Sequence, residues 1–163
     1  MDLIKEVNIK EKIVVKQHIL PIINKINEHI KDKNYFELEL LINETFSKHN
    51  LYNSDSAYWY HSSEEFIIST LSHYIQKHKV NDFIEFLENT YNCETIIKEA
   101  QRVSKLKGVL GNTHKFLTTV QSKIPEYNNY DTKEVNGADI FFFHFKRCLF
   151  DILELEYENK KEI

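Results

Sequence analysis

The sequence predicts an all-α fold: a single globular bundle of about six to seven helices joined as antiparallel hairpins. Only three glycines and two prolines occur in 163 residues, whereas hairpin-rich β folds need many residues that accept a positive φ. Apolar residues also recur at helical spacing along most of the chain. The length is typical of one domain, and we expect residues 1–163 to form a single α-helical domain.

The first two predicted helices form a hairpin. One apolar face contains Ile19, Ile22, Ile23, Ile26 and Ile30. Pro21 either kinks a helix that begins near Glu11 or occupies the first turn of a new helix. Asn34 and Glu37 resemble a capping box that opens the second helix. Because so short a link separates the two helices, we expect them to pack antiparallel.

Four more helices are predicted in the middle of the chain. Ser62 to Glu65 is a second capping signal, followed by Phe66, Ile67, Leu71, Tyr74, Ile75 and His78 on an amphipathic helix. Asn81 can cap a shorter helix, and a further helix runs from Glu94 to Lys107 and ends at Gly108. Asn112 or Thr113 can start the next one, which Pro125 ends.

The last predicted helix runs from about Asp139 to Tyr157 and is rich in phenylalanine. A helix that is apolar around most of its surface is usually central, so we expect this one to be the spine of the bundle. A polar line should face water, and it consists of Arg147, Asp151, Glu154 and Glu158. The helix starts near Asn34, Asn81 and Asn112 follow no constant period, which favours a globular bundle over a repeat array.

The segment before the third helix is the richest candidate for partner binding. It combines the only tryptophan with two tyrosines, a histidine and two carboxylates: Tyr58, Trp59, Tyr60, His61, Glu64 and Glu65. Aromatic residues of this kind are enriched at interface hot spots. Glu154 and Glu158 in the acidic tail could add attraction for a basic partner. The alternative interpretation is a loop held to the bundle by Trp59, with the two glutamates only complementing the helix dipole.

A basic block offers a second type of partner. Residues 93–124 carry a net positive charge, and Lys98, Arg102, Lys105, Lys107 and Lys115 could form one strip for nucleic acid. A solvated surface balanced by the acidic tail explains the same residues. The net charge of −4 and the presence of only two arginines weaken the nucleic-acid hypothesis.

Signals for a cofactor or metal are absent from the sequence, and we predict neither. Glycine is too scarce for a phosphate-binding loop, and Cys93 and Cys148 form no CxxC motif. His73 and His78 do not share a helix face, so we interpret them as one surface and one partly buried histidine. His144 lies one helical turn before Cys148, but the phenylalanines around this pair favour core packing over nucleophilic catalysis.

These patterns predict a non-enzymatic domain that binds another protein, with an immunity-protein or antitoxin type of inhibitor as one version. Nucleic-acid binding through the basic strip is the second hypothesis. The third is a small enzyme that uses His61, Glu64 and Glu65 for acid–base chemistry. The longest apolar run, Ile140 to Phe143, is far too short to span a bilayer, so we expect no use of a membrane. Two cysteines that lie 55 residues apart fit no disulfide framework, which favours a reduced, cytoplasmic setting.

Overall fold

Seven α-helices and one short 3-10 helix make up most of the computed structural model, which describes residues 11–49 and 56–158. The α-helices are α1 (Leu20–Asp32), α2 (Tyr35–Ser47), α3 (Ala57–Gln76), α4 (Phe83–Asn89), α5 (Cys93–Ser104), α6 (Gly111–Lys123) and α7 (Gly137–Ile152), and the 3-10 helix is Tyr127–Asn129. A two-residue strand near the start, β1 (Ile13–Val14), pairs antiparallel with β2 (Glu156–Tyr157). The prediction of an all-α bundle is confirmed.

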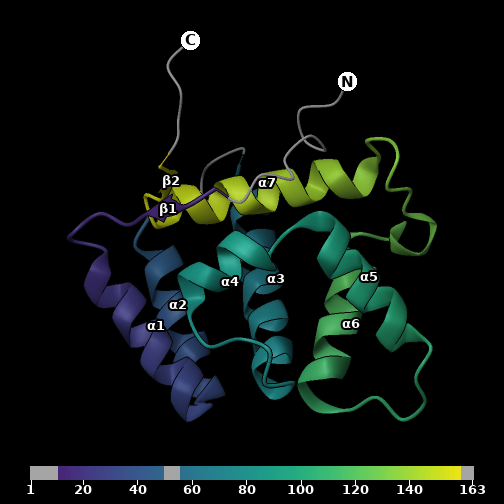
Figure 1. Cartoon of the computed structure of the whole chain (residues 1–163), viewed down its shortest axis with the longest axis horizontal. Coiled ribbons are helices and arrows are strands. Elements are labelled where there is room, and N and C mark those ends of the chain that lie inside the picture. The colour runs from purple at the N-terminus through teal and green to yellow at the C-terminus, as the bar shows by residue number, and fades with distance from the viewer. Residues whose placement is uncertain (1–10, 50–55, 159–163) are drawn as a thin grey trace.

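Most helices stand side by side, and α7 lies across one end of them (Figure 1). The central helix is α3, which packs against α2, α6 and α7. Every residue from Phe66 to Ile75 is buried. Within the described residues, none of the helices combines the length and the apolar character needed to cross a membrane.

The expected central position of the last helix is wrong. One face of α7 is buried through Phe142, Phe145 and Leu149, but Ile140 and Phe143 on its other side are 47% and 48% exposed. The physical reason lies in α3, which has helices on several sides. Buried serines and threonines interrupt its apolar pattern, so its sequence is a weaker signal of burial than a run of phenylalanines.

Several helix starts follow their capping residues. Asn34 caps α2 as predicted, because its side chain accepts a hydrogen bond from the Glu37 N–H. Pro21 lies in the first turn of α1, which is the second of the two predicted alternatives. The cap of α4 is Asp82, one residue after the predicted Asn81.

Two other helix starts were misplaced because tertiary contacts use the expected capping residues. Helix α3 begins at Ala57, five residues before Ser62, and the Ser63 hydroxyl donates to the Phe145 carbonyl at 2.6 Å instead of capping. Helix α6 begins at Gly111, with Leu110 in the cap position. The Thr113 hydroxyl lies 3.0 Å from a ring nitrogen of His73.

Candidate functional site

A groove between α2 and α3 contains three of the residues that the sequence pointed to, Tyr60, His61 and Glu64. It encloses about 270 Å³. We call it the α2–α3 groove, and its lining consists of Leu40, Asn43, Glu44, Phe46, Ser47, Tyr60, His61 and Glu64.

Helical spacing places these side chains on the two walls of the groove. Leu40, Glu44 and Ser47 follow an i, i+4, i+7 pattern along one face of α2. On α3, Tyr60 and Glu64 are one turn apart and therefore lie on the same side. Packing between α2 and α3 brings these two faces together.

The groove is acidic, because its lining among the described residues includes Glu44 and Glu64 but no lysine or arginine. Burial raises the pKa of Glu64 to about 7, with further contributions from the Glu65 and Glu39 carboxylates. Lys115 lies 3.2 Å from Glu39. Lys123 lies 3.6 Å from Glu65. Within residues 11–49 and 56–158, no lysine or arginine forms such an ion pair with Glu64, and His61 Nδ1 lies 4.0 Å from a Glu64 carboxylate oxygen.

The aromatic residues predicted as anchors have mostly structural contacts. The Trp59 ring packs against His144 and Phe141, with centroid distances of 4.4 and 5.5 Å. Trp59 therefore holds α3 against α7, as the alternative interpretation proposed, although it lies on a helix and not in a loop. Tyr58 differs, because 53% of its surface is exposed and the Lys123 ammonium lies 5.9 Å from its ring centroid.

Tyr60 also joins α3 to α7. Its hydroxyl donates to an Asp151 carboxylate oxygen at 2.5 Å. This hydrogen bond, together with burial and the Asp151 charge, raises the pKa of Tyr60 to about 12. Only part of the Tyr60 side chain is therefore available to line the groove.

The two predicted acidic-tail residues lie at the β1–β2 pair and do not line the groove. A carboxylate oxygen of Glu154 lies 2.9 Å from His18 Nε2, and the other lies 3.6 Å from Lys16 Nζ. The backbone N–H of Glu158 donates to the Lys12 carbonyl at 2.7 Å. Glu154 and Glu158 are therefore not part of the lining of the α2–α3 groove, although Asp151, which accepts the Tyr60 hydrogen bond, precedes Glu154 by three residues.

The predicted basic strip is divided by ion pairs. Lys98 lies 3.8 Å from Glu94 on the same helix. Arg102 donates two hydrogen bonds to Glu99, at 2.8 and 2.9 Å. Lys115 contacts Glu39 on α2, whereas Lys105 and Lys107 lie beyond the last turn of α5.

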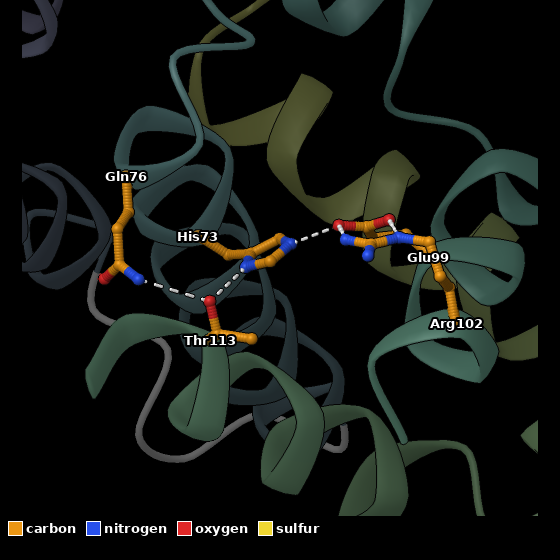
Figure 2. Close-up of polar contacts among 5 residues, drawn as sticks. All are labelled: His73, Gln76, Glu99, Arg102 and Thr113. Carbon is orange, nitrogen blue, oxygen red and sulfur yellow. Dashed lines mark hydrogen bonds and ion pairs between the residues drawn. The ribbon is translucent and has the colours of Figure 1, made fainter. Parts of the chain in front are cut away.

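A second polar cluster lies inside the bundle and joins α3, α5 and α6 (Figure 2). Its centre is His73, whose side chain is fully buried. One ring nitrogen lies 3.0 Å from the Thr113 hydroxyl, and the other lies 2.5 Å from a Glu99 carboxylate oxygen. The Gln76 amide donates to Thr113 at 3.3 Å. The His73 ring stacks on Phe116, with centroids 4.5 Å apart and planes within 6°.

The charge of Glu99 is strongly stabilised in this buried cluster. Burial alone would raise the pKa of Glu99, but hydrogen bonds from His73 and Arg102 outweigh it and lower the pKa to about 2. A carboxylate, an imidazole and a hydroxyl in a row resemble a catalytic relay. However, Thr113 is only 5% exposed, so a substrate has no access to its hydroxyl and we interpret the cluster as a structural crosslink.

Sequence reasoning missed this cluster because its members come from distant segments. His73 was interpreted as partly buried or at the surface, and nothing in the sequence linked it to Glu99 or Thr113. One signal was present: His73 lies between Leu71 and Tyr74 on the apolar part of its helix. A histidine in that position needs a polar partner inside the protein.

The remaining candidates for chemistry behave as core residues. Burial raises the pKa of the Cys148 thiol to about 11, which opposes formation of the nucleophilic thiolate. His144 stacks on Trp59, and burial lowers its pKa. Among the described residues, no three His, Cys, Asp or Glu side chains form a group that could hold a metal ion.

Comparison of the chain with protein-family models, with curated proteins and with solved structures found no match.

Proposed function

We propose that this chain is a protein-binding domain that holds a basic segment of its partner in the α2–α3 groove. The observation that carries the proposal is an imbalance of charge. Glu44 and Glu64 line the groove, and neither forms an ion pair with a lysine or arginine of the described chain. A lysine or arginine from a partner would supply the missing counter-charge through a charge-assisted hydrogen bond.

The size and lining of the groove fit one side chain of a partner. Small-molecule pockets commonly enclose roughly 300–1,000 Å³, and the groove, with about 270 Å³, lies just below that range. Leu40 and Phe46 supply apolar surface for the stem of a lysine or arginine, whose charged group would then meet the carboxylates. Acidic residues on the rim would also steer a basic partner toward the groove.

An inhibitor of the immunity-protein or antitoxin type is a more specific version of this proposal. In that version the groove covers a basic surface that the partner needs for its own activity, as an acidic protein can do by occupying a phosphate-binding region. Addition of this protein to the purified partner should then abolish the partner's activity at stoichiometric concentration. Unchanged partner activity would contradict the inhibitor version and leave binding intact.

Affinity capture with matched variants tests the binding proposal. The tagged protein is expressed in its native host, and co-purifying proteins are identified by mass spectrometry. Glu44→Lys places a positive charge in the groove at an exposed helix position, so we expect it to lose a stoichiometric partner that the unchanged protein retains. Trp59→Ala is unsuitable, because Trp59 packs between α3 and α7.

Glu94→Lys on α5 is the control for net charge. Glu94 is also exposed on a helix, and within the part of the chain that the structure describes its one ion pair is with Lys98 at 3.8 Å. The control should retain the partner. Retention by both variants would show that the groove is not the site, and recovery of the protein alone would contradict the proposal.

The enzyme hypothesis has one observation in its favour, the raised pKa of Glu64 beside His61. A carboxyl group with a pKa of about 7 can act as a general acid near neutral pH. Burial and two neighbouring carboxylates explain the same shift without a catalytic role. Since the groove lining contains no side chain activated as a nucleophile, we favour binding.

A further inference from the structure

Several helix ends meet at the end of the bundle that lies away from α7 (Figure 1). The end of α1 contacts the segment after α3, because Lys33 Nζ lies 2.7 Å from His78 Nδ1. The start of α6 contacts the end of α3 through the Asn112 N–H, which donates to the Gln76 side chain at 3.2 Å. Helix α2 starts here as well, directly after α1.

This end of the bundle is basic. The segments that form it are residues 29–37, 74–79 and 105–114, and together they contain six lysines against two carboxylates, Asp32 and Glu37. We call the lysines, together with three exposed apolar residues, the basal face. It consists of Lys31, Lys33, Lys77, Lys79, Lys105, Lys107, Phe36, Leu106 and Leu110.

The apolar residues of the basal face are unusually exposed. Leu110 is 79% exposed and Phe36 is 71% exposed, the two highest values among the exposed large hydrophobic residues of the described chain. Leu106 adds a third such side chain at 47%. Leu110 also occupies the N-cap position of α6, where it makes no capping hydrogen bond. Serine or asparagine would serve the helix better there, so folding does not explain this leucine.

A pocket opens at the same end, beside the last turn of α1. It encloses about 530 Å³, and Lys31, Lys33 and His78 belong to its lining. Lys33 and His78 both have a left-handed backbone, with φ of 54° and 59°, which is uncommon for residues other than glycine. Glu28 also lines this pocket, and Lys33 Nζ lies 2.7 Å from His78 Nδ1, so the pocket itself carries mixed charge and the excess of lysine belongs to the surface around it.

We infer that the basal face docks on an anionic lipid surface. The lysines would contact headgroup phosphates and carboxylates, and Phe36 and Leu110 would enter the boundary between headgroups and acyl chains. Binding of this kind combines charge with a small apolar insertion, and it is reversible and sensitive to salt. The inference is independent of the α2–α3 groove.

The composition of the basal face favours lipid over other anionic partners. Lysine is depleted from protein–protein interfaces, which are enriched in arginine, tyrosine and tryptophan, and the three segments contain no arginine or tryptophan. A nucleic-acid duplex would use the lysines for its phosphates but would leave Leu110 in water. A bilayer uses both kinds of residue.

Co-sedimentation with vesicles at low salt tests the inference. The unchanged protein should bind vesicles of equimolar phosphatidylcholine and phosphatidylserine but not vesicles of phosphatidylcholine alone. The double variant Phe36→Ser/Leu110→Asn keeps every lysine and should bind the mixed vesicles about tenfold more weakly or worse, because two apolar side chains no longer leave water. Leu110→Asn supplies a favoured N-cap residue, so the fold should not suffer.

Phe143→Ser is the matched control, since Phe143 is 48% exposed on α7 at the opposite end. It should bind the mixed vesicles as the unchanged protein does. Three results would overturn the inference: no preference for the anionic vesicles, equal binding by the double variant, or equal loss in the control. Tight binding to duplex DNA that the double variant retains, without vesicle binding, would assign the basal face to nucleic acid instead.

Discussion

Replacement of Glu99 by glutamine should destabilise the protein and change how its stability depends on pH. Glu99 has a pKa of about 2, compared with an ordinary value of 4.5. At about 1.4 kcal/mol for each tenfold change, this difference sets an upper limit of about 3 kcal/mol on the stabilisation from the charged form. Because Arg102 is 48% exposed and solvent screens its charge, we expect Glu99→Gln to cost about 2 kcal/mol at pH 7.

The sign of the pH effect follows from the lowered pKa. Glu99 binds a proton more readily in the unfolded chain than in the folded protein, so its contribution is complete above pH 4.5 and is lost as the pH falls toward 2. The variant lacks this titration. The difference in the free energy of unfolding between the two proteins should therefore shrink to roughly half by pH 3.5.

Urea denaturation followed by circular dichroism at pH 7, 5 and 3.5 measures this difference, with Glu94→Gln as the control. Glu94 lies on the same helix, but its pair with Lys98 is exposed, and loss of such a pair should cost less than about 0.5 kcal/mol. The reasoning is refuted if Glu99→Gln is no more destabilising than the control at pH 7. A deficit that stays constant from pH 7 to 3.5 would refute the role of the charge.

Two further predictions concern titratable groups on α7 whose pKa is shifted by burial. Burial lowers the pKa of Lys146 to about 8, so Lys146→Met should raise the free energy of unfolding by about 1 kcal/mol at pH 7. This gain should fade toward pH 10 as the lysine loses its proton. Denaturation at both pH values checks this, and no gain at pH 7 would contradict it. Cys148 should react with a thiol reagent only when the protein unfolds, because its thiol is buried and has a pKa of about 11. The Cys93→Ser variant isolates this thiol, and rapid labelling of the folded variant would contradict the prediction.

The sequence predicted what depends on local pattern. Helical spacing identified the bundle, and Asn34 capped its helix as its side chain suggested. The positions that failed depend on tertiary contacts. Ser63 resembles a capping residue, but in the folded protein it bonds to the Phe145 carbonyl of α7. No local pattern distinguishes these two uses of a serine.

The α2–α3 groove was likewise only partly predictable from the sequence, because it depends on which helices pack together. Tyr60, His61 and Glu64 were singled out from one continuous segment, and they lie on one wall. The other wall comes from α2, where Leu40 and Glu44 attracted no attention because nothing in the sequence says which helices pack together. The partner-binding role of these residues remains a prediction, as does that of Glu154 and Glu158.

The groove and the basal face lie in different halves of the bundle, which decides whether both proposals can hold together. The groove uses the C-terminal half of α2 and the N-terminal half of α3. The basal face uses the opposite ends of the same two helices, from Phe36 on α2 to Lys77 after α3. A protein docked on a membrane by its basal face would therefore leave the groove open to the aqueous side. The separation of acidic groove from basic face would also orient the molecule, because an anionic surface attracts one half and repels the other.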